Sequence, residues 1–316
     1  MSDQQFAIQQ GEKVGLIALH DAWRQGDLDR PIHLRDDCWV LPEAPLQMQA
    51  HWQEWLGTIR AKAIQEATVW LATKAPSAMP GIVNEEDQQL RVRVEHLFYA
   101  LLITGPVSYE QGFILGGANV AGTSEVRQFS DLLAYRVTKG TRDTSVSLAQ
   151  VQRAGVMAQG LDAIFGDPGA MRMRAGIAVF LRGLEREYLE ARLHQFVRAL
   201  EGVVKPAIMK SKRQFVDRCQ TFSGRSAQHE AILDECYSIR NQVEHLHDWQ
   251  LGLAHVPEAQ REDRLTADQH AIEALCRLVY GRLCESAAHR TLFGDDSIDQ
   301  FWTRPEHERQ QLWGRR

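Results

Sequence analysis

The sequence predicts a mainly α-helical protein, with a helical bundle in its C-terminal half and a mostly helical N-terminal region that includes a few short strands. Three observations support this fold class. Apolar residues recur at three- and four-residue spacings in both halves, as on the buried face of an α-helix. Every segment beyond Thr144 that could form an element has this pattern. Of the 316 residues, 44% are hydrophobic, which is enough for a large buried core.

The N-terminal half contains the less regular elements. The apolar stretches 14–18 and 38–41 have the length of short strands. Residues 46–72 have a helical, Trp-rich pattern, and residues 74–81 contain two prolines and predict a loop. A helix over 85–103 follows from its apolar spacing. The Gly-rich segment 105–122 lacks the spacing of nucleotide-binding loops and predicts a loop or short strands.

The C-terminal half predicts four helices. Asp167-Pro168 begins a long one that Lys205-Pro206 ends, because proline is favoured in a first turn and disrupts an interior. Shorter helices are expected over 207–221 and 226–249, and another from Thr266 onward. We therefore divide the chain into two regions. Residues 166–316 form a helical domain, and residues 1–165 form a region whose role is unknown, with substrate choice and regulation as the two options.

Composition limits the function classes. The net charge of −5 argues against a protein that coats nucleic acid by bulk charge. The cations are 29 Arg and only 7 Lys, and the planar guanidinium of Arg can bind an anion such as phosphate through two N–H donors at once. The five cysteines form no C-x-x-C pair, so reduced thiols in a cytoplasmic protein are expected. Residues 1–10 are polar and no long apolar run occurs, so neither a signal peptide nor a membrane span is expected.

The most informative segment is the predicted helix over 226–249. Its expected core stripe recurs at four, three, four and three residues: Ile232, Cys236, Ile239, Val243 and Leu246. At about 100° per residue, Asn241 points away from that stripe and His245 lies one turn further on the same open face. Arg240 and Glu244 fill the sector between the two faces. The alternative for this surface is an ordinary solvated helix face with an Arg240–Glu244 ion pair.

The segment Arg240-Asn-Gln-Val-Glu-His245 resembles the R-polar-x-x-x-H motif of the HEPN domain superfamily (higher eukaryotes and prokaryotes nucleotide-binding). An aromatic and an aliphatic residue, Tyr237 and Ile239, precede the Arg. The upstream segment 192–201 is similar to the leading helix of such bundles, and the resemblance covers residues 170–290. Many members carry Gly after the His, where this chain has Leu246.

The resemblance implies an all-α, metal-independent endoribonuclease of the HEPN type, such as a toxin or defence effector. Arg240 would stabilise the phosphorane, His245 would act as acid and base, Asn241 would assist, and Glu244 would be a secondary neighbour. His247 fits the longer spacing of the motif and is the alternative histidine. The expected partners are RNA, a second copy forming a composite site, and an antitoxin or regulatory protein. The alternative function is a non-catalytic HEPN-like module that binds RNA, nucleotide or protein.

The residue types suit RNA cleavage by 2′-OH attack. Imidazole titrates near neutral pH and can accept or donate the proton, and Arg can hold the phosphate with two hydrogen bonds. Arg240 and His245 lie about 140° apart around one helix, so two helices meeting at a two-fold axis would present the set better. His245, His247 and Asp248 diverge too much for a metal site, and no cofactor or metal is expected. A basic cluster forms a weaker RNA-binding candidate: Lys210, Lys212, Arg213 and Arg218.

Overall fold

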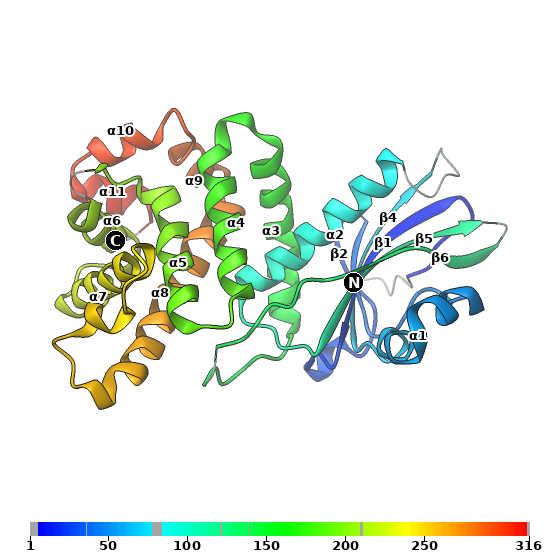
Figure 1. Cartoon of the computed structure of the whole chain (residues 1–316). Coiled ribbons are helices and arrows are strands. Elements are labelled where there is room, and N and C mark those ends of the chain that lie inside the picture. The colour runs from blue at the N-terminus through cyan, green and yellow to red at the C-terminus, as the bar shows by residue number, and fades with distance from the viewer. Residues whose placement is uncertain are drawn as a thin grey trace. The chain divides into compact units, whose positions relative to one another are not determined.

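The computed structural model describes residues 6–35, 37–77, 84–120, 122–138, 140–208 and 211–314. The chain divides into two compact units. The first comprises Met1–Val137 and Thr141–Asp162, and the second comprises Thr138–Gly140 and Ala163–Arg316. Figure 1 shows strands in the first unit, whereas the described elements of the second are helical.

The first unit is built on a six-stranded sheet of order β2-β3-β4-β1-β5-β6, and its paired strands are all antiparallel. The strands are β1 (Glu12–His20), β2 (Ile32–Arg35), β3 (Cys38–Leu41), β4 (Val69–Pro76), β5 (Gln111–Val120) and β6 (Thr123–Asp131). The prediction of a mainly α protein with a mostly helical N-terminal region is therefore wrong. The chain is a mixed α/β protein, because the N-terminal half forms a sheet.

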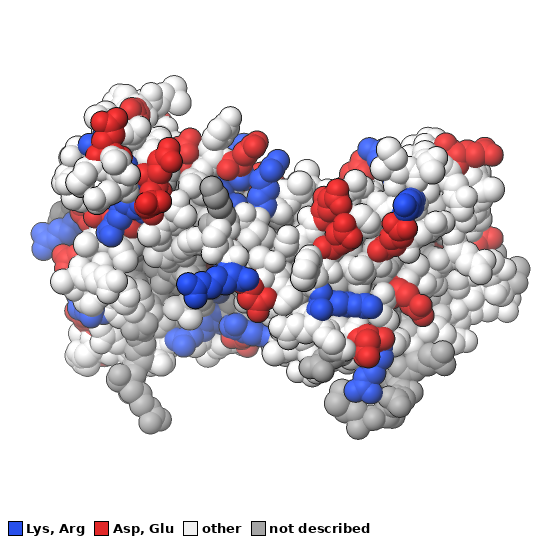
Figure 2. Space-filling view, turned by 90° about the horizontal axis from the view of Figure 1, so that it is seen from below, with Lys and Arg blue, Asp and Glu red and all other residues white. Residues whose placement is uncertain are grey.

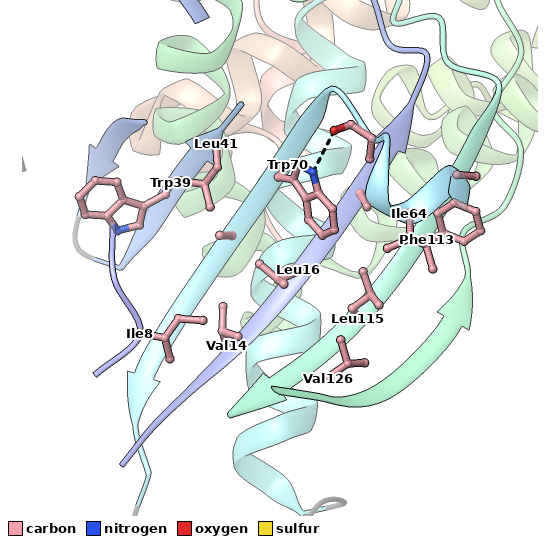
Figure 3. Packing of buried hydrophobic residues seen from close by; sticks show 14 of the residues in the cluster. Ile8, Val14, Leu16, Trp39, Leu41, Ile64, Trp70, Phe113, Leu115 and Val126 are labelled. Carbon is pink, nitrogen blue, oxygen red and sulfur yellow. Dashed lines mark hydrogen bonds between the residues drawn. The ribbon is translucent and has the colours of Figure 1, made fainter. Parts of the chain in front are cut away.

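Helices cover both faces of this sheet. Alternate residues such as Leu16 and Leu115 face α1 (Ala50–Gln65), which contributes Leu56 and Ile64 to the same core. Trp70 lies in this core, and its indole nitrogen donates to the carbonyl of Ala67 at 3.1 Å (Figure 3). The opposite face of the sheet packs against α2 (Glu85–Thr104).

The backbone of α2 approaches the central strand closely. A Cβ atom at Gly15 of β1 would lie 2.8 Å from the carbonyl oxygen of Leu90. The hydroxyl of Thr73, on the adjacent strand, donates to that same oxygen at 3.2 Å. Glycine is therefore required at position 15 for space, since any side chain would push the helix off the sheet.

Several sequence predictions for this unit hold. The strands at 14–18 and 38–41 and the helix over 85–103 are confirmed. The helix over 46–72 is wrong in its second part, because residues from Val69 onward form β4. The Gly-rich segment 105–122 supplies the long strand β5, in which Phe113 and Leu115 alternate toward the core. The glycines of β5 interrupt the two-residue alternation of apolar side chains by which a strand is predicted. They lower the strand propensity of the segment but do not prevent strand pairing.

The second unit is a helical bundle. Its helices are α4 (Met171–Glu185), α5 (Leu189–Val204), α6 (Ser211–Ser223), α7 (Ala227–Glu244), α8 (Arg261–Glu285), α9 (Ala287–Leu292), α10 (Ile298–Thr303) and α11 (Glu306–Leu312). The helix α3 (Leu148–Gly166) crosses the division between the units. The sequence predicts a single helix over 167–204, but the structure has two helices there, because extended backbone at Arg186 separates α4 from α5. The predicted stop at Lys205-Pro206 is confirmed.

A buried ionic network joins α5 to α8. The carboxylate of Glu273 lies 2.6 Å from Arg277 and 3.4 Å from Arg192, and it accepts from Gln269 and Thr138. Burial alone would raise the pKa of Glu273, but the two guanidinium groups outweigh burial and lower it. The charge is thus fully paired, as a buried carboxylate must be.

All five cysteines are free and buried, and burial raises the pKa of each thiol above its usual value. They pack as small apolar residues. Within the part of the chain that the structure describes, no helix is both long and apolar enough to cross a membrane.

Two carboxyl groups meet between α7 and α8. Glu235 is 2.5 Å from the guanidinium of Arg264 and 3.1 Å from the ring of His255. Asp268 is almost fully buried, 3.3 Å from Arg264. Burial raises the pKa of Asp268 to about 8, with the charge of Glu235 adding to the rise. The pKa of Glu235 is lowered, since hydrogen bonds from its neighbours outweigh its own burial.

Because its pKa is higher in the folded state, Asp268 favours folding at acidic pH, and that contribution is lost as pH rises from about 4 to 8. We expect Asp268→Asn to be more stable than wild type at pH 8, by about 1 kcal/mol or more, and to flatten the pH dependence. Urea unfolding at pH 5 and pH 8 measures both. Equal pH slopes in wild type and variant would show that Asp268 stays ionised.

Candidate functional site

Helix α7 carries the candidate residues, and local sequence explains how it begins. The Ser226 hydroxyl accepts from the backbone nitrogen of His229 at 3.0 Å and caps the first turn. Leu233, Cys236 and Ile239 are buried and hold the helix in the bundle. Next to these residues, the ring of Tyr237 contacts Phe215 of α6, and Arg240 contacts Glu201 of α5.

The end of α7 differs from the prediction. The helix stops at Glu244, and His245 is its C-cap. Leu246 adopts the left-handed conformation with φ 58°. Two hydrogen bonds close the turn, from Leu246 to the carbonyl of Val243 at 3.2 Å and from His247 to the carbonyl of Gln242 at 2.9 Å. These are the two bonds of a Schellman motif.

This turn alters the predicted faces. Leu246 is 94% exposed and Val243 only half-buried, so the expected core stripe ends at Ile239. The predicted continuation to Trp249 is wrong, and His247 lies beyond the helix. A left-handed residue at this position is the role that glycine usually serves. Leu246 thus makes the turn that glycine would make more easily.

The guanidinium of Arg240 lies against α5. Its Nη2 is 3.2 Å from Glu201 Oε2, and its Nη1 donates to Asn241 Oδ1 at 3.2 Å. It also lies over the ring of Tyr237, at 5.5 Å from the centroid. Only 16% of the Arg240 side chain is exposed. The sequence-predicted Arg and Asn are therefore in direct contact, and α5 holds the Arg in place.

A second pair lies beside it. His194 of α5 and Glu244 of α7 approach at 2.5 Å between Nε2 and Oε2. Glu244 Oε2 is also 4.0 Å from Arg240 Nη2. The hydrogen bond with His194 is the main cause that lowers the pKa of Glu244, and Arg240 and the exposed Arg198 add to it. The carboxylate is thus held ionised between α5 and α7.

The two predicted histidines lie outside this pair of contacts. His245 and His247 are exposed, and their ring centroids are 6.2 Å apart. His247 Nδ1 is 3.2 Å from Gln242 Oε1. No hydrogen bond among the described residues joins either ring to Arg240. One chain therefore brings Arg240, Asn241 and Glu244 together and leaves both imidazoles at the surface.

Sequence reasoning missed His194 and Glu201. They are seven residues apart, which places them on one face of α5, two turns from each other. The seven-residue spacing is the feature of the sequence by which they could have been found. A His and a Glu on one helix face can pair with a Glu and an Arg on a neighbouring helix. Recognising them required knowing that α5 packs against α7.

The described residues of the predicted basic cluster have different partners. Lys212 pairs with Asp234 at 2.8 Å, and Arg218 donates to two backbone carbonyls at 2.6 Å. Burial is the main cause that lowers the pKa of Arg218. Arg213 is exposed, and Lys210 lies outside the described residues. Lys212 and Arg213 line a groove of about 1070 Å³ together with acidic side chains, including Asp234.

The molecular surface in Figure 2 also carries both basic and acidic side chains. Figure 2 shows basic and acidic side chains interspersed on the face in view among the described residues, rather than one extended basic field. Any RNA contact on such a surface would depend on a few arginines and not on bulk charge.

Comparisons with known proteins identify no relative. No protein-family model, curated protein or solved structure matches the chain.

The strained end of α7 yields a stability prediction. A non-glycine residue in the left-handed region costs about 1–2 kcal/mol, and Leu246 has almost no buried surface to lose. Glycine is also more flexible when unfolded, which offsets part of the gain. We expect Leu246→Gly to raise the free energy of unfolding by about 1 kcal/mol.

Chemical denaturation of Leu246→Gly beside Leu246→Ala checks this expectation. Alanine keeps the unfavourable conformation and should give no gain. A glycine variant no more stable than the alanine variant would contradict the Schellman turn.

Proposed function

We propose that the chain is a metal-independent endoribonuclease of the HEPN type, acting in the cytoplasm as a toxin or defence effector. The observation that carries the proposal is the group of Arg240, Asn241 and Glu244 on one helix end, directly before two exposed imidazoles. This group contains the charge, the hydrogen-bond donor and the proton carriers that cleavage by 2′-OH attack requires.

Arg240 can still bind phosphate in this arrangement. A guanidinium has five N–H donors, and the contacts with Glu201 and Asn241 use one each on Nη2 and Nη1. Its terminal nitrogens retain donors for a phosphate oxygen. Because Glu201 and the ring of Tyr237 hold the side chain in one position, little ordering is needed when RNA binds.

The histidines would move the proton. His245 is the proposed acid and base, with His247 as the alternative, since both are exposed within the turn that ends α7. Glu244 is already engaged by His194, so its role would be to position groups rather than to accept the 2′-OH proton. His245 is the C-cap of α7, and no hydrogen bond among the described residues joins its ring to Arg240, which favours a composite site between two copies. RNA, a second copy and a regulatory protein such as an antitoxin are the proposed partners.

One observation favours a second candidate, a non-catalytic HEPN-like module that binds RNA, nucleotide or protein. The charge of Arg240 is balanced by Glu201 and approached by Glu244, as in a network that only stabilises packing. Under this function the same face would bind a ligand without cleaving it.

Cleavage of mixed RNA in EDTA separates the two functions. We expect His245→Ala to lower the rate by about 100-fold or more, the usual contribution of a general acid or base. Arg240→Lys should also lose most activity while it keeps the charge and the fold, because lysine lacks the two-pronged geometry. Circular dichroism verifies folding of each variant, and His247→Ala tests the alternative histidine.

The matched control is Arg91→Ala, since Arg91 also precedes a histidine by five residues and is half exposed. It should cleave at the wild-type rate, and a substrate with a 2′-deoxy scissile nucleotide should resist wild type. RNA that binds but stays intact would support the non-catalytic module. Cleavage that survives both Arg240→Lys and loss of each histidine would refute the mechanism.

A further inference from the structure

A group of metal-ligating side chains lies in the first unit, apart from every residue discussed above. His20 ends β1, Asp21 follows it, and Glu110 immediately precedes β5. Each offers one donor atom, and these atoms lie within 4.8 Å of one another. Among the described residues, this is the one such group of three.

The backbone brings the three side chains together. The nitrogen of Glu110 donates to the carbonyl of His20 at 2.9 Å, so the two residues are neighbours across the β1–β5 pair. Asp21 has a left-handed backbone with φ 54°, and its Oδ1 lies 3.9 Å from His20 Nε2. Glu110 Oε2 lies 3.7 Å from His20 Nδ1. Both separations are too long for hydrogen bonds.

The imidazole of His20 supplies an independent observation. The side chain is 15% exposed, and its Nδ1 atom is buried with no hydrogen-bond partner among the described residues. Such a buried nitrogen calls for an explanation, and an ion or a water is a common one. The Glu110 carboxylate lies on the Nδ1 side of the ring and the Asp21 carboxylate on the Nε2 side. Each is more than 60% exposed, so each has room to turn toward one ring nitrogen.

We propose that His20, Asp21 and Glu110 bind one divalent transition-metal ion, such as Zn²⁺ or Mn²⁺. Metal–donor distances of about 2.0–2.2 Å place tetrahedral ligands about 3.4 Å apart. The three donor atoms lie within 4.8 Å of one another, so the exposed carboxylates must turn toward a single ring nitrogen of His20 to bind one ion. One imidazole and two carboxylates suit these ions, whereas Ca²⁺ and Mg²⁺ prefer oxygen ligands throughout.

The surroundings leave room for a further ligand. Three protein donors leave at least one coordination position open. Glu110 also lines a cavity of about 600 Å³ between α1 and the β5–β6 strands, whose wall includes Arg60 and Asp131. A water or small anion bound on the Glu110 side of the ion would face this cavity, whose lining does not include His20 or Asp21. This metal site is separate from the proposed RNA cleavage, which is independent of metal.

Isothermal titration of EDTA-treated, tag-free protein with Zn²⁺ or Mn²⁺ alone tests the proposal. Wild type should bind one ion per chain, and Glu110→Gln and Asp21→Asn should each weaken binding by about 10-fold or more. His20→Ala should abolish it. His51→Ala, which removes an exposed histidine elsewhere in the same unit, should bind as wild type does.

Circular dichroism confirms that each variant is folded, and Glu110→Gln and Asp21→Asn change only exposed side chains. Absence of binding to wild type would overturn the proposal. Binding that is equally strong in folded Glu110→Gln, Asp21→Asn and His20→Ala proteins would also overturn it, because the ion would then lie elsewhere.

Discussion

The packing of α7 against α5 positions the candidate site, and the ion pair between Arg240 and Glu201 lies at its centre. Both side chains are less than one-fifth exposed, so each charge has lost most of its water. A guanidinium in that environment needs a carboxylate nearby, and removing either partner would leave the other charge buried and unpaired. The same contact therefore stabilises the bundle and fixes the position of Arg240.

The pair of His194 with Glu244 extends this arrangement by one turn of α7. Helices α5 and α7 pack against each other and thus carry two ionic contacts across their interface. The last turn of α7 then breaks into the left-handed Leu246. The arginine is consequently rigid, whereas the two histidines project from a short exposed turn. A fixed guanidinium beside exposed imidazoles is compatible with the proposed site being completed by a second copy.

The sequence predicted the elements whose apolar period was clean. Helix α2 followed from its spacing, and the end of α5 followed from Lys205-Pro206. The sheet was underestimated because glycines interrupt the alternation in β5, and because β4 follows α1 without proline or glycine between them. Strand pairing also depends on contacts distant in sequence, such as β1 with β5, which local patterns do not contain.

The candidate site shows the same limit. Arg240, Asn241 and Glu244 are local to one helix, so their proximity could be predicted. His194 and Glu201 could not, since they reach the site only through the packing of α5 on α7. The end of the helix was missed for another reason. Leucine at position 246 gives no signal for a left-handed turn, which glycine would have given.

The central claim is that Arg240 binds the scissile phosphate of RNA. The most direct measurement is a crystal structure of the protein with a short RNA whose scissile 2′-hydroxyl is replaced by hydrogen. Our account predicts a phosphate within hydrogen-bonding distance of the Arg240 terminal nitrogens, with His245 or His247 of either copy beside it. A phosphate bound away from Arg240, with the Arg240–Glu201 pair unchanged, would contradict it.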